Sequence, residues 1–117
     1  MKTALIFFDS SLLSLVVQKM VADMGMGFIT LKSEKDFPKA LDNGKIDVVL
    51  TDMLYRKKEN PLLRTIKRRK IPFLIISDKG HPGDIKDALK KGAGEYIIKP
   101  FDHDILQSKL SMMGMGE

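Results

Sequence analysis

Short apolar runs alternate along this chain with longer segments in which apolar residues recur at helical spacing. Three runs, at residues 3–8, 46–51 and 73–76, have the length and composition of buried strands. Two shorter runs, at 28–31 and 96–98, complete the series. Strands that alternate with helices are typical of βαβ units, in which the strands form a parallel sheet. The pattern therefore predicts an α/β fold of five strands and five helices.

The predicted helices have recognisable ends. Apolar residues recur at helical spacing over residues 12–24, and Gly25 is expected to end that helix. Ser33 or Asp36 can cap the second helix, and Pro61 is a favourable first residue for the third. The apolar faces of the last two helices are expected at residues 85–89 and 105–110.

Composition limits the classes of protein to consider. A chain of 117 residues has room for one domain, here 1–117, and we expect residues 112–117 to form a flexible tail. The absence of cysteine excludes disulfides, a thiol nucleophile and a thiolate metal site. No apolar stretch approaches the roughly 18 residues that a membrane span needs. The first apolar run meets Asp9 too early for a secretory signal, so we expect a cytoplasmic protein.

Four of the expected strands end on a residue with a charged or hydroxyl side chain. Asp9 follows the first strand, Asp52 the third, Ser77 the fourth and Lys99 the fifth. The carboxyl ends of parallel strands meet at one edge of a sheet, where open α/β folds bind their ligands. We therefore expect these two acids, one hydroxyl and one amine to form a site there.

Two stretches have a specific pattern beyond this periodicity. Residues 88–101 contain a Gly-Ala pair, then the aromatic Tyr96, then Lys-Pro-Phe, and residues 47–52 form an apolar strand that ends on Asp52. Over residues 3 to about 111 the chain resembles the receiver domain of two-component response regulators, the fold of the chemotaxis response regulator. The resemblance implies a flavodoxin-like, doubly wound (βα)5 fold whose five-stranded parallel sheet has the order 2-1-3-4-5.

The resemblance also implies a phosphoryl-transfer site. Asp52 would be the phosphoacceptor, and Asp9, Asp52 and the backbone carbonyl of Leu54 would bind Mg²⁺. This ion prefers octahedral oxygen ligands and keeps several waters. Phosphoryl transfer depends mainly on positioning and on neutralising charge, which such a set of ligands supplies.

A switch and its partners follow from the same resemblance. Lys99 would pair with the phosphoryl group, Ser77 would turn toward it, and Tyr96 would move into the space that Ser77 leaves. In the family the bond between Lys99 and Pro100 is usually cis. The implied partners are a histidine kinase or phosphotransfer protein and a downstream protein that binds the face formed by helix four, strand five and helix five.

The first strand departs from the family pattern. Receivers usually end it with two adjacent acids, whereas this chain has Phe8-Asp9. Counting back from Gly25 places Asp9 on the acid that contacts the metal directly, with Phe8 in place of the acid that acts through water. A register slipped by one residue would leave Ser10 in place of the direct ligand, but the helix periodicity favours the first alignment. We expect weakened Mg²⁺ binding.

Two further departures lie at the same edge. Asp78 stands where receivers have a small residue, and residues 53–60 replace the family's Met-Pro and Asp-Gly. Asp78 can substitute for the missing acid or repel an incoming phosphoryl group.

Several of these residues also have a purely structural interpretation. Asp9 can cap the first helix, as Ser10 or Ser11 can, and capping and metal ligation are equally open for Asp9. His81 and His103 have no partner at ligand spacing, so we expect both at the surface.

Residues 56–70 hold eight basic side chains against the single acid Glu59, a local charge of +7, while the other residues sum to −2. Cations suit the end of a helix, so a solvated basic face is the default interpretation. Because no aromatic residues are interleaved with the cations, nucleic-acid binding is not favoured.

Three functional hypotheses follow. The leading hypothesis is a phosphoacceptor receiver, which is no enzyme beyond transferring a phosphoryl group onto and off itself. The rival is a pseudo-receiver that binds proteins and is never phosphorylated, suggested by Phe8 and Asp78. The third, with least support, is a polyanion-binding module that uses residues 56–70.

Overall fold

The computed structural model describes residues 2–52, 61–78 and 82–115. Within them, five parallel strands form one sheet in the order β2-β1-β3-β4-β5, which confirms the expected fold and topology. The strands are β1 (Thr3–Phe7), β2 (Gly27–Thr30), β3 (Val48–Thr51), β4 (Phe73–Ser77) and β5 (Glu95–Ile98). The helices are α1 (Ser11–Asp23), α2 (Phe37–Asn43), α3 (Pro61–Arg68), α4 (Pro82–Lys90) and α5 (His103–Met112), with a short 3-10 turn at Glu34–Asp36 before α2.

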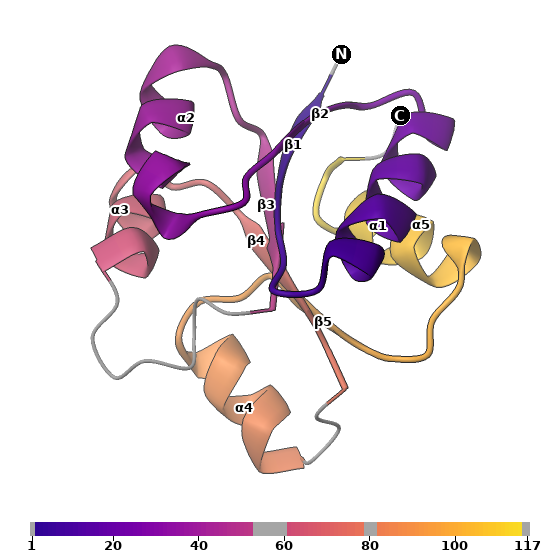
Figure 1. Ribbon diagram of the computed structural model, residues 1–117. Coiled ribbons are helices and arrows are strands. Elements are labelled where there is room, and N and C mark those ends of the chain that lie inside the picture. The colour runs from indigo at the N-terminus through magenta and orange to yellow at the C-terminus, as the bar shows by residue number, and fades with distance from the viewer. Residues whose placement is uncertain (1, 53–60, 79–81, 116–117) are drawn as a thin grey trace.

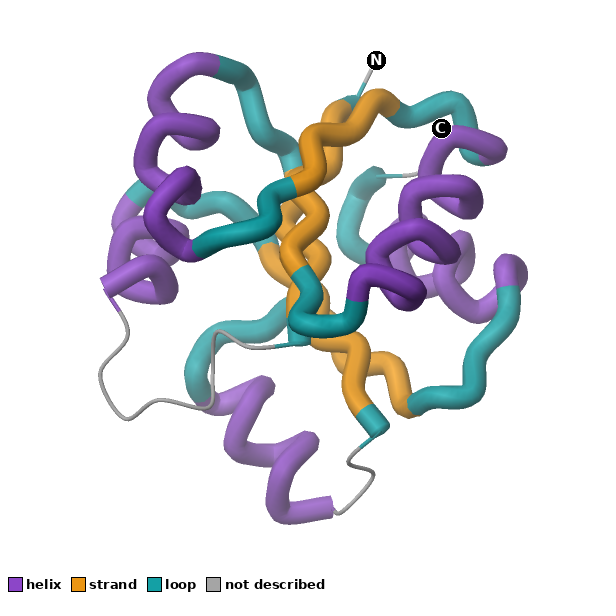
Figure 2. Tube along the Cα trace, viewed as in Figure 1, coloured by secondary structure: helices purple, strands orange, loops and turns teal. Residues whose placement is uncertain are grey.

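Helices cover both faces of the sheet. Figure 1 shows α1 and α5 on one face and α2, α3 and α4 on the other, and Figure 2 shows the strands as a single twisted layer between them. Side chains of a strand point alternately to the two faces, so neighbouring residues of β1 belong to different cores. Ile6 and Phe8 pack with α1 and α5, whereas Leu5 and Phe7 pack with α2, α3 and α4.

Helix α1 buries a narrower stripe than its sequence suggests. Leu13, Val17 and Val21 face the sheet and are buried. Leu12 and Leu15, in contrast, are 72% and 61% exposed. A helix that lies on a sheet buries about one residue per turn fully, so the additional apolar residues of α1 remain in contact with solvent.

Four of the helices end in the same backbone turn. After α1, the amide of Met26 donates to the carbonyl of Val21 at 3.2 Å, and Gly25 has a φ of 79°. This pattern is a Schellman motif, in which a left-handed residue ends the helix and the next residue returns to the core. The same bond joins Ile71 to Ile66 after α3, Ala93 to Ala88 after α4, and Met115 to Leu110 after α5.

The end of the chain is described as far as Met115. Helix α5 continues through Met112, and Met113 and Met115 pack against the core beneath α1 and α5. Both helices of this face are followed by the same four residues, Met-Gly-Met-Gly, at 24–27 and 113–116. The second Met of each repeat occupies the apolar position that follows a Schellman turn, so the sequence of the presumed tail is a helix cap as far as Met115.

Candidate functional site

Asp9 and Asp52 meet at the carboxyl edge of the sheet. The register of β1 and β3 pairs Phe7 with Thr51, so the residues that follow each strand lie side by side. The backbone amide of Asp9 donates a long hydrogen bond of 3.4 Å to Oδ1 of Asp52. Asp52 is only 6% exposed, whereas Asp9 is exposed to solvent.

Ser77 and Lys99 extend this row across the next two strands. β4 lies beside β3, and β5 lies beside β4 with Ser77 level with Ile98. The amide of Lys99 donates to the carbonyl of Ser77 at 2.9 Å, and the bond between Lys99 and Pro100 is cis. The Ser77 side chain is buried and that of Lys99 is half-buried. The four residues predicted from the strand ends therefore occupy neighbouring positions along one edge.

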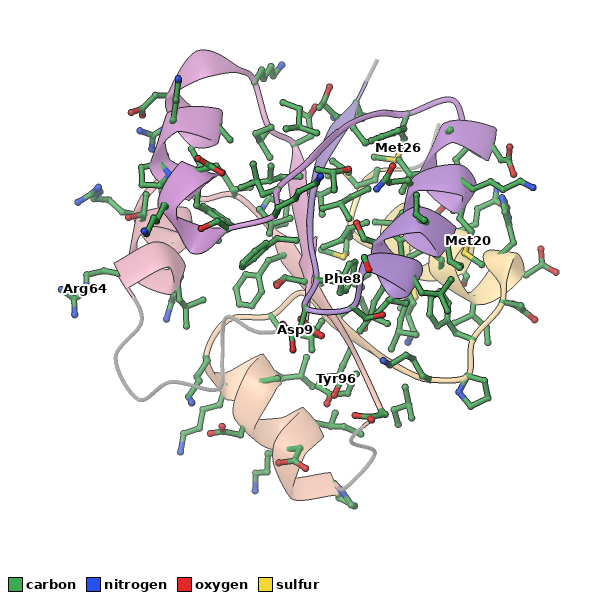
Figure 3. The ribbon with its side chains drawn as sticks, in the orientation of Figure 1. Phe8, Asp9, Met20, Met26, Arg64 and Tyr96 are labelled. Carbon is green, nitrogen blue, oxygen red and sulfur yellow. The ribbon has the colours of Figure 1, made fainter. Side chains whose placement is uncertain are left out.

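Tyr96 is buried one step back from this edge. It belongs to the core shared with α4, together with Ala88 and Ile75. Figure 3 shows it between the sheet and α4, on the same side of the molecule as Asp9. The ring of Tyr96, which was predicted as the switch residue, thus faces inward.

Phe8 lies on the opposite side of the chain from Asp9. Its side chain is buried against Leu13 and Val17 of the first helix, and Figure 3 shows it beside the first turn of α1. Ser10 caps that helix, since its hydroxyl accepts a hydrogen bond of 3.2 Å from the amide of Leu13. Asp9 therefore does not cap α1, and it remains available beside Asp52.

Other predicted residues have different outcomes. Asp78 directly follows Ser77 and is exposed. His103 is the first residue of α5 and lines a shallow apolar groove with Leu15 and Val16 of α1. Leu54 and His81, with the rest of residues 53–60 and 79–81, lie outside the described part of the chain.

The chemistry of the donors fits a hard cation. Asp9 and Asp52 supply carboxylate oxygens within one hydrogen-bonded contact. In the described residues no group of three acids, histidines or cysteines is placed to bind a metal. A pair of carboxylates suits Mg²⁺, which keeps several water ligands, better than it suits ions that require a full set of protein ligands.

Apolar side chains are exposed on two parts of the described surface. One surface is on α1, where Leu12, Leu15 and Val16 follow the turn that holds Asp9. The other consists of Leu89 on α4, Ile98 on β5 and Ile105 on α5. Periodicity assigned most of these residues to the core, and no sequence signal separated them from the buried residues beside them.

Two basic residues, one in α3 and one just after it, make contacts with other elements. Arg69 bonds the carbonyl of Leu41 at 3.0 Å and pairs with Asp42, which ties α3 to α2. A Cβ added at Gly92 would lie 3.3 Å from Cε of Lys67, so the lysine stem covers the end of α4. Figure 3 shows Arg64 extending from α3 away from the sheet. In the described range 61–70, at least two cations thus stabilise the contacts of α3.

No described helix has the length and apolar character needed to span a bilayer.

Comparison with known proteins adds to this geometry. Residues 4–111 match the family model of the response regulator receiver domain. The chemotaxis protein CheY1 of Helicobacter pylori (strain ATCC 700392 / 26695) is 26% identical over 119 residues, which cover 93% of this chain and 94% of that protein. The sensory transduction protein BceR of Bacillus subtilis (strain 168) is 37% identical over 46 residues, and the match covers only 20% of its length.

Solved structures show the same architecture. A response regulator from Thermotoga maritima superposes with a TM-score of 0.84 at 25% identity, over 97% of this chain and 98% of that one. The receiver domain of the sensor histidine kinase PA1611 from Pseudomonas aeruginosa PAO1 has a TM-score of 0.76 at 19% identity, over 97% and 98% of the two chains. That structure contains a magnesium ion coordinated in its active site cleft.

Proposed function

Because the chain belongs to the response regulator receiver domain family, we propose that it accepts a phosphoryl group on Asp52 from a histidine kinase or a phosphotransfer protein. The observation that best supports this role is the alignment of Asp9, Asp52, Ser77 and Lys99 along one edge of the sheet, with the Asp9 amide on the Asp52 carboxylate. Receiver domains are signalling switches, so the phosphorylated carboxylate is the signal.

The reaction is a transfer between two side chains. A carboxylate oxygen of Asp52 attacks the phosphorus of a phosphohistidine on the donor. A P–O bond forms and the P–N bond breaks, and the electrons of the broken bond leave with the imidazole, which takes up a proton. The product is an acyl phosphate on Asp52 and a neutral histidine on the donor.

Each neighbouring residue has a proposed task. Asp9 and Asp52, with the carbonyl of Leu54, would hold Mg²⁺, and the bound ion would neutralise charge between the carboxylates and the phosphoryl oxygens. Lys99 is half-buried, and its ammonium pairs with a phosphoryl oxygen in a charge-assisted hydrogen bond. Ser77 turns toward the phosphate, and Tyr96 responds from the core beneath α4.

The exposed apolar surfaces suggest where partners bind. A donor must contact the rim of the site, and Leu12 and Leu15 of α1 offer an apolar surface there. A downstream protein would use the α4-β5-α5 face, which exposes Leu89 and Ile98. Exposed apolar patches commonly mark such surfaces.

The experiment is intact mass spectrometry after incubation with Mg²⁺ and acetyl phosphate. The wild-type protein is expected to gain one phosphoryl group, which hydroxylamine removes, and Asp52→Asn is expected to gain none. A gain that persists in Asp52→Asn would contradict the assignment of the phosphoacceptor.

One observation favours a second candidate, the pseudo-receiver. Phe8 is buried in the core, so the edge has one acid fewer than receivers usually have. A calorimetric Mg²⁺ titration separates the two candidates, because a protein-interaction module needs no metal. The pseudo-receiver would be favoured if millimolar Mg²⁺ gave no heat of binding and if neither acetyl phosphate nor a histidine kinase added a phosphoryl group.

A further inference from the structure

A hollow of about 520 Å³ opens between α1 and the carboxyl end of β2. Its size lies in the range of small-molecule sites. Residues of three segments line it: the end of β1, the first two turns of α1, and the end of β2 with the residues that follow. The lining residues are Phe8, Asp9, Ser11, Ser14, Leu15, Gln18, Thr30, Leu31 and Lys32. Apart from Asp9, and from Leu15 on the surface proposed for the phosphodonor, none of these residues has a task in the proposed phosphoryl transfer.

Thr30 gives the first sign of a missing partner. Its Oγ1 atom is buried, and among the described residues it has no hydrogen-bond partner. A buried hydroxyl without a partner is unfavourable, and such atoms are rare in proteins. Since Thr30 itself lines the hollow, a rotation about χ1 that exchanges its hydroxyl and methyl groups would present the hydroxyl to a ligand there.

Ser14 supplies a second donor. Its side chain is buried, and its Oγ accepts a hydrogen bond of 3.2 Å from Nε2 of Gln18. An oxygen that accepts from Gln18 still has its own proton to donate. Lys32, which is exposed, contributes a positively charged side chain to the lining of the hollow.

The remaining walls are apolar. Phe8 and Leu31 are buried, and Leu15 is exposed at the rim. Phe8 belongs to this wall because its ring turns to the α1 side of the sheet, where an acid would have made the lining more polar. With the hydroxyl of Thr30 rotated toward it, the hollow therefore combines two hydroxyl donors and a cation with apolar walls.

We propose that this hollow binds a small carboxylic acid with an apolar body, with the carboxylate on Lys32 and the hydroxyls of Thr30 and Ser14. Carboxylates accept several hydrogen bonds, and those from an ammonium are the strongest. Asp9 at the edge of the hollow opposes an anion, but its charge is taken up when it binds a metal with Asp52. Bound Mg²⁺ therefore raises the affinity for the acid, and the acid raises the affinity for Mg²⁺ by the same factor.

The test is a chemical-shift titration of ¹⁵N-labelled protein with hexanoate in the presence of Mg²⁺, beside hexanol and hexylamine. Hexanoate is expected to shift the amides of Ser11, Ser14, Thr30, Leu31 and Lys32. Hexanol, which has the same chain without the charge, is expected to bind at least about tenfold more weakly. The hexanoate titration is repeated with Asp52→Asn, where shifts of the same amides are expected at higher hexanoate concentrations, because this variant binds Mg²⁺ more weakly. Because Asp52→Asn lacks the proposed phosphoacceptor, binding of hexanoate to this variant would test the hollow independently of phosphorylation.

Two variants and one control complete the design. Lys32→Gln is expected to weaken hexanoate binding about tenfold, and Thr30→Val about fivefold. Lys39→Gln changes an exposed lysine that does not line the hollow and is expected to leave the affinity unchanged. The proposal is overturned if millimolar hexanoate shifts none of these amides, if hexanol binds as tightly, or if Lys32→Gln binds like the wild type.

Discussion

Phe8 is the residue at which this chain departs from the acidic pair that usually ends the first strand of receivers. In a strand whose residues alternate between two faces, Phe8 falls on the α1 side, and its ring is 6% exposed against Leu13 and Val17. Receivers usually have an acid at this position. If residue 8 is the position of the outer metal-site acid, as the resemblance implies, Phe8 gains stability from burial and gives up metal affinity.

This opposition predicts the behaviour of Phe8→Asp. Removing the buried ring is expected to lower the free energy of unfolding by about 3 kcal/mol, while the new carboxylate tightens Mg²⁺ binding about tenfold. Urea unfolding measures the first effect and calorimetric Mg²⁺ titration the second. Phe8→Leu is the matched control, since it should lose part of the stability without a gain in metal affinity. Equal Mg²⁺ affinity in Phe8→Asp and Phe8→Leu would mean that residue 8 does not reach the metal site.

Substitution at Thr30 is expected to change the free energy of unfolding in the opposite direction. Because its buried hydroxyl has no partner among the described residues, Thr30→Val removes an unfavourable group and keeps the shape of the side chain. The free energy of unfolding is expected to rise by about 1 kcal/mol. A loss of stability in urea unfolding would show that the hydroxyl has a partner, such as an ordered water.

At the scale of elements, the helix ends are the most regular feature of the molecule. Gly25, Gly92 and Gly114 take the left-handed conformation after α1, α4 and α5, but Lys70 takes it after α3 with a φ of 59°. A side chain in that conformation costs about 1 kcal/mol relative to glycine. The turn after α3 is therefore strained where the other three are relaxed.

Lys70→Gly is accordingly expected to stabilise the protein by about 1 kcal/mol, and Gly25→Ala to destabilise it by a similar amount. No atom lies within 4 Å of a Cβ added at Gly25, so the second effect would come from the backbone alone. Thermal unfolding of both variants checks the signs. The interpretation fails if the two substitutions shift the melting temperature in the same direction.

The elements also show what a sequence can predict. Apolar runs predicted the five strands within one or two residues, and helical spacing predicted the order of the helices, because apolar runs and glycine stops are local signals. The same patterns could not show that Leu12 stays exposed beside buried Leu13, since this depends on how α1 lies on the sheet. They also could not show that Met115 returns to the core, because a Met-Gly repeat reads equally as a cap or as a tail.

At the scale of the whole molecule, the site was partly predictable for a topological reason. Parallel strands end at one edge, so Asp9, Asp52, Ser77 and Lys99 had to be neighbours once the strands were known. The hollow beside Thr30 was not predictable, because it is formed by three segments whose separation depends on packing. The roles of these residues came from the family resemblance, because the spacing of apolar residues carries no information about chemical function.

Metal binding should be visible in global stability. A ligand that binds only the folded state stabilises it, by about 1.4 kcal/mol when its concentration is about ten times its dissociation constant. Mg²⁺ is therefore expected to raise the melting temperature of the wild-type protein, and chelation with EDTA to reverse the increase. Asp52→Asn should show a much smaller increase. A similar increase in Asp52→Asn would place the ion elsewhere.

The Schellman turns after α1, α3, α4 and α5 have a consequence for how this scaffold can diverge. They close the helices at the edge of the sheet opposite Asp52, and their geometry depends on backbone bonds within each turn. Helix termination therefore does not depend on the residues at the edge that carries Asp52. Those residues can be substituted without changing the backbone turns that end the helices. By the resemblance to receivers, Phe8 and Asp78 are two residues of this edge that depart from the usual pattern, while the helix ends on the opposite edge keep their geometry.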